Sequence, residues 1–477
     1  MQYDAIIIGA GMSGLAAGIR LAQQGRRVAI VEKHYVWGGL NSFYGKSGYS
    51  FDVGLHALTN FVPKGTRGMP LTRTIKQLRL RYDDFALGEH GHSEILFPDA
   101  HLLFSNDFEL LTEEVARVFP SEVDRFRALA KEIETSVWDE RPKEFISARA
   151  ELAKRLNDPM LLEMLLLPTC YYGSAMEDDV EWDQFKVLFS SIFLEGLARP
   201  EGGVRTILNL LVKRFRKVGG ELLMNNGVAR IHTGTDAVVS GVVLDDGREL
   251  ESDTVISSAG LVETMAMCGS EIEGRGVETA DRGRLTFLES IYVLDCTPTS
   301  LGHTAATSFF STQSRFDYHP PSDFCDVRSG LVSSPNNFAS TKPMKDQILR
   351  MTVLANGNRW AELSPEAYAA QKEIEANRAE AALIEFTNNE NLRGEPRQNW
   401  NQHTVFRDVF TPKTIQHFTS HPGGIVYGSP RKRKSGETDI TGLHLCGTDH
   451  GYLGIVGAMA SGCIIANDQL LAPLQSS

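Results

Sequence analysis

Three glycines near the amino terminus have the spacing of a phosphate-binding turn. Gly9, Gly11 and Gly14 directly follow a short apolar run and precede an alanine-rich stretch. The first glycine permits a tight turn, the second lets a pyrophosphate approach the backbone, and the third lets a helix pack closely on a strand. The first amides of that helix, from Met12 and Ser13, would then meet the phosphates. The pattern therefore predicts a dinucleotide site.

Glu32 supplies the acid that such a site requires. It ends a second apolar run, 28–31, and follows Gly14 at close to the expected separation of about 20 residues. Its carboxylate can accept hydrogen bonds from both hydroxyls of a ribose, and its negative charge disfavours a 2′-phosphate. We therefore expect the ADP-ribose part of FAD or NAD, and not of NADP, beside Glu32.

A strand, a helix and a second strand must position these residues. Residues 5–8 and 28–31 are apolar throughout, as buried parallel strands are. The stretch between them predicts a helix that continues to about Gln24 and is closed by Gly25. This order of elements turns a weak glycine pattern into a specific one.

Three further polar side chains are candidates for a role in catalysis: His56, His450 and Tyr452. A histidine can transfer a proton near neutral pH, and a structural role for His56 is an equally open interpretation. His450 and Tyr452 lie in a glycine-rich segment, where they would either face a substrate or pack in the core. The sequence has no Ser-His-Asp spacing and no His-Glu-x-x-His motif, so we expect no metal site.

The composition indicates a globular protein of about two domains. The chain has 477 residues, of which 42% are apolar and 23% charged, and its formal net charge is −12. A chain this acidic is a poor binder of nucleic acid, so we expect no such partner. The six cysteines include no C-x-x-C pair, which argues against a disulfide framework or a zinc site and favours a reducing compartment. We expect a cytoplasmic protein.

No stretch reaches the roughly 18 uninterrupted apolar residues that a membrane span needs. One segment, residues 64–82, is nevertheless basic and carries apolar residues at near-helical spacing, Leu71, Ile75, Leu78 and Tyr82. Its basic residues are Lys64, Arg67, Arg73, Lys76, Arg79 and Arg81. The segment predicts an amphipathic helix that would lie on anionic lipid. The alternative is a solvated helix packed on its own domain.

Gly38, Gly39 and the segment from Gly48 to Gly54 distinguish FAD from NAD. The segment reads Gly-Tyr-Ser-Phe-Asp-Val-Gly. Together these residues resemble the phytoene desaturase, carotenoid isomerase and retinol saturase group of the flavin amine oxidase superfamily. The resemblance implies that the glycine pair packs under the pyrophosphate of FAD and that a hairpin at 48–54 leads to the flavin, with His56 at its end. The sequence departs from the group at Leu40, where many relatives place Arg or Ser.

The segment from Gly442 to Asn467 resembles the closing FAD motif of the same group. A strand at 443–446 and a helix from about 455 to 471 are expected here. Asp449 would bind ribitol or ribose hydroxyls, and the amides at the start of the helix would face the flavin. A Pro-x-Gly-Gly pattern at 200–203 and the run 410–430 extend the likeness to about half of the chain. No flavin-linking cysteine motif is evident, so FAD should be bound non-covalently.

The residues expected to bind the cofactor are Gly9, Gly11, Met12, Ser13, Gly14, Glu32, Lys33, Gly38, Gly39, Val228, Ala259, Gly447, Asp449, Gly454, Val456, Gly457 and Ala458.

The resulting fold is α/β, or α+β overall, with a Rossmann-type FAD-binding domain built from discontinuous segments. We expect that domain at 1–58, 200–285 and 424–477, and a substrate-binding domain of sheet and helices at 59–199 and 286–423. Helices are expected at 113–118, 126–135, 148–156 and 365–387, and strands at 287–294 and 347–355.

Three functions follow. The first is an FAD-dependent oxidoreductase that desaturates, saturates or isomerises an apolar isoprenoid or polyene by hydride transfer at flavin N5. The alternative is a flavin amine oxidase that oxidises a small aromatic amine, with O2 as acceptor and H2O2 as product. The third is a flavoprotein without catalysis, which an intact FAD framework disfavours. Peripheral membrane association, substrate identity and oligomeric state stay open.

Overall fold

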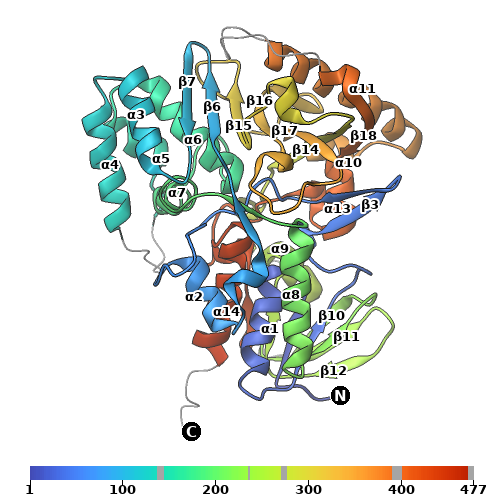
Figure 1. Ribbon diagram of the computed structural model, residues 1–477. Helices are drawn as coiled ribbons and strands as arrows, with labels where there is room; N and C mark the ends of the chain where they lie inside the picture. The colour runs from blue at the N-terminus through green and yellow to red at the C-terminus, as the bar shows by residue number, and fades with distance from the viewer. Residues whose placement is uncertain (137–143, 235–236, 270–276, 389–399, 471–477) are drawn as a thin grey trace.

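Five parallel strands form the centre of the lower half of the molecule in Figure 1, here called the five-stranded body. The computed structural model describes residues 1–136, 144–234, 237–269, 277–388 and 400–470. The strand order is β19–β13–β1–β2–β9, and every pairing is parallel. The strands are β1 (Ala5–Ile8), β2 (Val28–Val31), β9 (Glu221–Leu223), β13 (Val255–Ser257) and β19 (Leu443–Leu445). The expected Rossmann-type α/β fold is confirmed.

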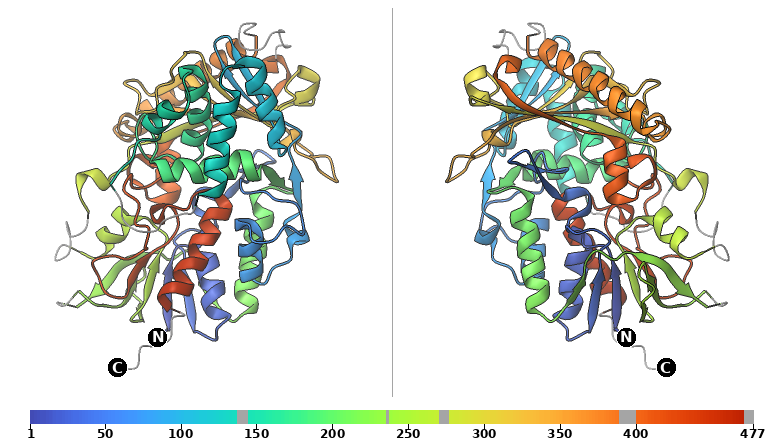
Figure 2. Two further views of the ribbon diagram at one scale, coloured as in Figure 1. Left: turned by 90° about the vertical axis from the view of Figure 1, so that its left-hand side faces the viewer. Right: turned by 90° about the vertical axis from the view of Figure 1, so that its right-hand side faces the viewer.

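Both faces of this sheet are covered. Ile7 of β1 packs among helices on one face, whereas Ile6 and Ile8 pack against a three-stranded antiparallel sheet on the other. The helices are α1 (Met12–Ala22), α8 (Val204–Lys217) and α14 (Gly454–Leu470), and α1 lies along α14 in both views of Figure 2. The other face is covered by β10 (Val228–Thr233), β11 (Val239–Leu244), β12 (Glu249–Glu251) and helix α9 (Leu261–Met267). This explains why the parallel strands are apolar throughout.

A mixed sheet of seven strands organises the upper half, the seven-stranded body (Figure 1). Its order is β18–β14–β17–β16–β15–β6–β7, with β15 and β6 parallel and the other pairs antiparallel. The strands are β6 (Ser93–Phe97), β7 (Ala100–Phe104), β14 (Thr286–Leu294), β15 (Thr307–Ser311), β16 (Cys325–Ser333), β17 (Gln347–Ala355) and β18 (Thr404–Phe410).

Helices cover both faces of the seven-stranded sheet as well. One face packs on α3 (Phe108–Val118), α4 (Val123–Thr135), α5 (Ala148–Arg155), α6 (Pro159–Gly173) and α7 (Trp182–Phe189). The other face packs on α10 (Gly357–Ala361) and α11 (Pro365–Asn388), and α13 (Pro412–Thr419) follows β18. The helices and strands expected between 113 and 387 are confirmed, but β6 and β7 were not expected.

The predicted ends of the two helices near the cofactor turn agree with the structure to within two residues. Helix α1 runs to Ala22, and Gly25, with φ of 80°, closes it as predicted. The amide of Gly25 donates to the carbonyl oxygen of Ala22 at 3.1 Å, and the amide of Arg26 donates to that of Leu21 at 3.4 Å. The carboxy-terminal helix begins at Gly454, one residue before the predicted start. The expected domain limits stay a prediction. The five parallel strands do come from the three stretches assigned to one domain.

The basic segment 64–82 is a shorter helix than expected, α2 (Pro70–Gln77), and its apolar side is covered by the protein. Leu71, Ile75 and Leu78 are buried in the core that α1 and α14 share. The helix therefore packs on the five-stranded body, although the expected limits assign 59–199 to the other domain. Packing against the protein was the alternative interpretation, and the apolar face of the helix is covered in this way. Lys64 is paired with Asp83 at 2.7 Å. None of the described helices combines the length and apolar character that crossing a bilayer requires.

A short hairpin links the two bodies. It consists of β3 (Phe43–Lys46) and β4 (Tyr49–Asp52), and a second small ladder pairs β5 (Leu87–Glu89) with β8 (Ala198–Pro200). Phe51 of the hairpin packs on Ile291, Val293 and Ile348 of the seven-stranded sheet. The hairpin predicted at 48–54 is thus present, and its contact with the seven-stranded body holds it in place.

Two buried arginines fix the chain that follows this hairpin. Arg350 of β17 donates to both carboxylate oxygens of Glu289, at 2.7 and 2.8 Å, and to the carbonyl oxygen of Leu55 at 2.8 Å. Arg199 donates to the same carbonyl at 3.0 Å and is paired with the carboxylate of Asp52. Residues 52–55 are therefore held by charges that belong to the seven-stranded sheet and to β8.

We expect Arg350→Met to lower the free energy of unfolding by about 3–5 kcal/mol, because Glu289 would remain as a buried charge without its partner. The double variant Arg350→Met/Glu289→Gln should recover much of this loss. Urea denaturation measures both. Arg248→Met is the matched control, since both Arg248 and its partner Asp246 are half exposed and the loss of that pair should cost under about 1 kcal/mol. Equal losses at Arg350 and Arg248 would contradict this prediction.

Candidate functional site

The glycine turn between β1 and α1 has the predicted close packing. Gly9 has φ of 94°, and a Cβ there would lie 2.5 Å from Ser258 Oγ. A Cβ at Gly14 would lie 2.1 Å from the carbonyl oxygen of Gly9, so only glycine lets α1 approach the turn. Helix α1 begins at Met12 without a side-chain cap, and the first amides of a helix have no partner within it. The turn therefore presents unpaired amides to an anion.

The glycine pair lies directly beside this turn. The amide of Gly38 donates to the carbonyl oxygen of Ala10 at 3.0 Å, and Gly38 forms a parallel bridge with Gly11. Gly38 has φ of 122°, and a Cβ there would meet the carbonyl oxygen of Asn41 at 2.8 Å. Two glycine segments therefore run side by side with no side chain between them and the cavity.

Glu32 is buried at the end of β2, where it also supports the turn. Its Oε2 accepts from the amide of Ala10 at 2.8 Å and its Oε1 accepts from the amide of His34 at 3.0 Å. Each carboxylate oxygen keeps one further lone pair for a hydroxyl. The acid is thus held in one orientation beside the glycine turn, as a ribose diol requires.

Asp449 has a different environment from the one expected. Its carboxylate is buried and accepts from the amides of Ser429 and Leu261, at 2.7 and 2.6 Å. The Lys432 ammonium lies 3.9 Å from its Oδ1. Asp449 therefore ties three separate segments into one wall of the site, and any sugar hydroxyl would share oxygens that already bind backbone.

One cavity of about 810 Å³ joins these features to the seven-stranded sheet. Of the expected cofactor residues, it is lined by Gly9, Gly11, Met12, Ser13, Glu32, Lys33, Gly38, Gly39, Val228, Ala259, Gly447, Asp449, Gly454 and Ala458. Gly14, Val456 and Gly457 do not line it: Gly14 packs on the turn, and the Val456 side chain is buried in the core. No residue of the basic segment 64–82 lines this cavity.

His56 lines the far end of the cavity within a chain of hydrogen bonds. Its Nδ1 lies 2.8 Å from Ser333 Oγ and its Nε2 lies 3.2 Å from Thr352 Oγ1, which is 3.4 Å from Glu289 Oε1. Burial, together with the cations of Arg350 and Arg199, holds the pKa of His56 well below its ordinary value. The ring is therefore neutral at physiological pH and already bonded at both nitrogens.

Aromatic side chains surround this polar group. Tyr172, Phe287, Tyr427 and Tyr452 line the same end, and the rings of Phe287 and Tyr427 meet edge to face at 5.7 Å. The buried hydroxyl of Tyr172 has no hydrogen-bond partner among the described residues. Such an end excludes water while leaving a few polar atoms aimed inward.

The structure favours the packing interpretation of His450 over the substrate-facing one. Its Nε2 donates to the carbonyl oxygen of Lys434 at 2.9 Å, and Ser461 donates to its Nδ1 at 2.8 Å while accepting from the amide of Gly447. Burial lowers the pKa of His450 to about 4. His450 does not line the cavity, and its ring packs 4.9 Å from Tyr452, which does.

Sequence reasoning missed Glu289, Thr352 and Arg350. Each lies on a strand whose other residues are mostly apolar, β14 or β17. A charged residue inside an apolar strand indicates a buried, paired group, and that signal was available. Nothing in the sequence indicated that Glu289 would pair with Arg350, because the pairing depends on strand register.

A family model described as "Flavin containing amine oxidoreductase" matches residues 12–469 of the chain. The prolycopene isomerase 1 of an Oncidium hybrid cultivar is 25% identical, covering 94% of this chain and 80% of its own. The all-trans-retinol 13,14-reductase of Danio rerio is 24% identical, covering 98% and 87%. A neurosporene-forming phytoene desaturase of Rhodobacter capsulatus is 27% identical over 54% of this chain and 52% of its own.

Solved structures share the fold. An oxidoreductase from Methanosarcina mazei matches with a TM-score of 0.64 and 18% identity, covering 97% of this chain and 99% of that one. A wild-type putrescine oxidase bound to putrescine matches with a TM-score of 0.59 and 14% identity, covering 98% and 99%. At these identities the likeness is one of fold.

Gly9→Ala should abolish flavin binding while leaving a folded protein, because the new Cβ would displace Ser258 and the turn beside it. Gly25→Ala is the matched control at the other end of α1. Gly25 has φ of 80°, and a Cβ added there would meet no atom within 4 Å. The Gly25→Ala variant should therefore lose only about 1–2 kcal/mol of stability, through backbone strain. The ratio of flavin to protein absorbance after purification measures binding. Equal flavin content in the two variants would refute the assigned role of the turn.

His450 should make the protein less stable in acid. The pKa of His450 is about 4 in the folded chain, so the unfolded chain takes up its proton first as the pH falls below about 6.5. The contribution of neutral His450 to the free energy of unfolding is fully present above that pH. It is lost as the pH falls towards 4, and the loss is about 2 kcal/mol at about pH 5. His450→Gln should lose correspondingly less between about pH 7.5 and pH 5 in urea denaturation. An identical loss in wild type and variant would exclude this contribution.

Proposed function

The chain belongs to the flavin-containing amine oxidoreductase family, and from this premise we propose that it uses FAD to oxidise, reduce or isomerise an apolar isoprenoid or polyene. The observation that carries the proposal is the continuous cavity that joins the glycine turn to an aromatic end on the seven-stranded sheet. Two relatives that match over nearly the whole chain are named for prolycopene and for all-trans-retinol.

The residues at the glycine end fit FAD. A Cβ at Gly9 or Gly38 would collide with neighbouring atoms at 2.5 and 2.8 Å, so the cradle depends on glycine. Glu32 is oriented for the ribose, and α14 begins at the cavity wall with Gly454. Its amino-terminal amides would stabilise negative charge on a ring system placed there. FAD bound in this way would supply hydride acceptance or donation at N5.

The residues at the aromatic end would orient the substrate and keep water away. Phe287, Tyr172 and Tyr452 provide apolar surface for a hydrocarbon chain. His56 is neutral and bonded at both nitrogens, and Glu289 is paired with Arg350. We infer that His56 positions Thr352 and the cavity wall and does not accept a proton from substrate near neutral pH.

The cavity volume limits how a long substrate would bind. About 810 Å³ must hold both the cofactor and the reacting part of the substrate, and pockets of about 300–1,000 Å³ usually enclose one drug-sized ligand. A long polyene would therefore be enclosed only around its reacting bond. Basic residues of segment 64–82 remain exposed, so we propose that any contact with anionic membranes is made by these charges alone.

Amine oxidation is the competing function on the same scaffold. A cationic amine would need a carboxylate free to pair with it, but Glu289 is already bonded to Arg350 through both oxygens. This pairing disfavours a cationic amine. A neutral amine remains the competing substrate, and H2O2 formation separates it from a polyene.

The experiment is a turnover assay on the purified yellow protein. Prolycopene, phytoene and all-trans-retinol in liposomes, and phenylethylamine and putrescine in buffer, are each added with and without O2. We expect an altered polyene by chromatography and no H2O2 from the amines. Acid denaturation should release free FAD. H2O2 formation with an amine and no polyene product would overturn the proposal, and a flavin inert to all probes would indicate a non-catalytic flavoprotein.

A further inference from the structure

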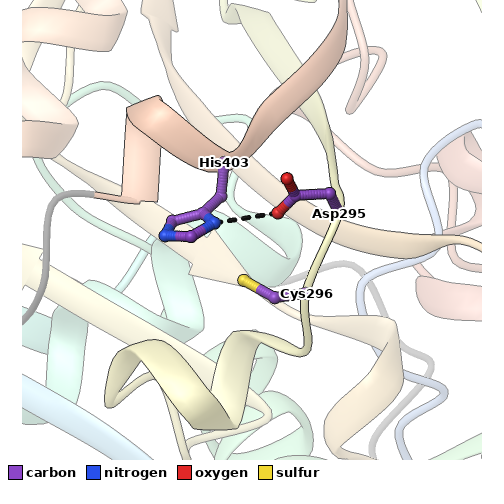
Figure 3. Close-up of side chains that lie close together, drawn as sticks. All are labelled: Asp295, Cys296 and His403. Carbon is purple, nitrogen blue, oxygen red and sulfur yellow. Dashed lines mark hydrogen bonds and ion pairs between the residues drawn. The ribbon is translucent and has the colours of Figure 1, made fainter.

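Three side chains with different donor atoms converge at one end of the seven-stranded sheet, away from the cavity. Asp295, Cys296 and His403 each contribute one carboxylate, thiol or imidazole atom, and these atoms lie within 4.8 Å of one another (Figure 3). None of the three lines the cavity. Asp295 and His403 are 108 residues apart in the chain, which is why no cysteine–histidine spacing revealed the group.

The strand ladder brings the residues together. Strands β14 and β18 are antiparallel, and Leu294 at the end of β14 pairs with Thr404 at the start of β18. One residue further, the amide of Asp295 donates to the carbonyl oxygen of His403 at 2.9 Å. The two ligand-bearing positions are therefore fixed opposite one another by backbone hydrogen bonds, independently of their side chains.

Packing beneath the group restricts its movement. Trp400, in the same turn as His403, is fully buried, and its ring meets that of Tyr292 at 4.6 Å. Cys296 packs at the edge of the same apolar core and remains partly exposed. A site with a rigid base and an accessible side can admit an ion from solvent.

The donor set selects the ion. Asp295 Oδ1 lies 2.8 Å from His403 Nδ1, and Cys296 adds sulfur. Zn²⁺ accepts carboxylate oxygen, imidazole nitrogen and thiolate sulfur together. Mg²⁺ and Ca²⁺ take oxygen ligands and would have little use for the thiol or the imidazole.

We propose that Asp295, Cys296 and His403 bind one Zn²⁺, with water in the fourth position. Binding breaks the S–H bond of Cys296, forms a Zn–S bond and releases that proton to solvent. The proton that His403 Nδ1 donates to Asp295 moves through solvent to Nε2, which leaves Nδ1 free to bind the ion, and no electron is transferred. Ligands about 2.0–2.3 Å from a tetrahedral ion lie roughly 3.3–3.8 Å apart, so small side-chain rotations would close the site. The ion would join the ends of β14 and β18 and act on the seven-stranded body alone.

The test is Zn²⁺ binding to the flavin-loaded full chain, measured by dialysis and metal analysis, with Co²⁺ as a spectroscopic probe of the thiolate bond. We expect one Zn²⁺ per chain. Cys296→Ser and Asp295→Asn should each weaken affinity by at least about 100-fold, the upper end of the loss caused by removing an outer-shell partner. His319→Ala is the matched control, since His319 and Asp178 form a similarly exposed pair at 3.2 Å; it should bind zinc as wild type does.

A second readout uses the cysteine itself. The other five cysteines are buried, so alkylation of the folded protein should report on Cys296, and Zn²⁺ should slow it. Flavin content should be unchanged in every variant, which separates this proposal from the proposed function. Alkylation unaffected by Zn²⁺, or equal zinc affinity in wild type and Cys296→Ser, would overturn the site.

Discussion

The carbonyl oxygen of Leu55 accepts hydrogen bonds from two buried arginines, and the shape of the cavity depends on this contact. Arg350 comes from the seven-stranded sheet and Arg199 from β8. Burial lowers the pKa of Arg199, so Asp52 only partly offsets the cost of desolvating that guanidinium. For Arg350 the opposite holds, because Glu289 and Asp52 outweigh burial and raise its pKa. Both arginines also fix the position of the chain that they bind. Together they hold the end of the hairpin between the two bodies, where a cavity wall is needed.

This arrangement also sets the electrostatics of the far end of the cavity. Two cations behind His56 disfavour a third, so the ring stays neutral and serves as a hydrogen-bonding spacer between Ser333 and Thr352. Without those cations and with less burial, the same histidine would titrate near neutral pH. Its residue type alone left both roles open, and its surroundings favour the structural one.

The glycine end could be predicted from the sequence because its determinants are local. Gly9, Gly11 and Gly14 act within one turn, and the apolar strands on either side define that turn. Glu289, Arg350 and the Asp295–His403 pair were not predictable in this way, since each depends on the register of strands far apart in the chain. The apolar spacing at Leu71 and Ile75 was correctly assigned to a helix. The sequence could not show whether that apolar face contacts lipid or protein, because the answer depends on the position of α14 in the folded chain.

The same distinction explains why the cofactor is better defined than the reaction. A dinucleotide contacts the backbone along much of its length. Its site therefore requires glycines, because they let the backbone approach the ligand closely. The aromatic end is formed by side chains from the segment after the hairpin, α6, β14 and β17, and none of these elements carries a motif of its own. Relatives about 25% identical can therefore share the first end while differing in the second. The proposed preference for a neutral polyene over a cationic amine depends on a pairing that only the folded chain reveals, that of Glu289 with Arg350.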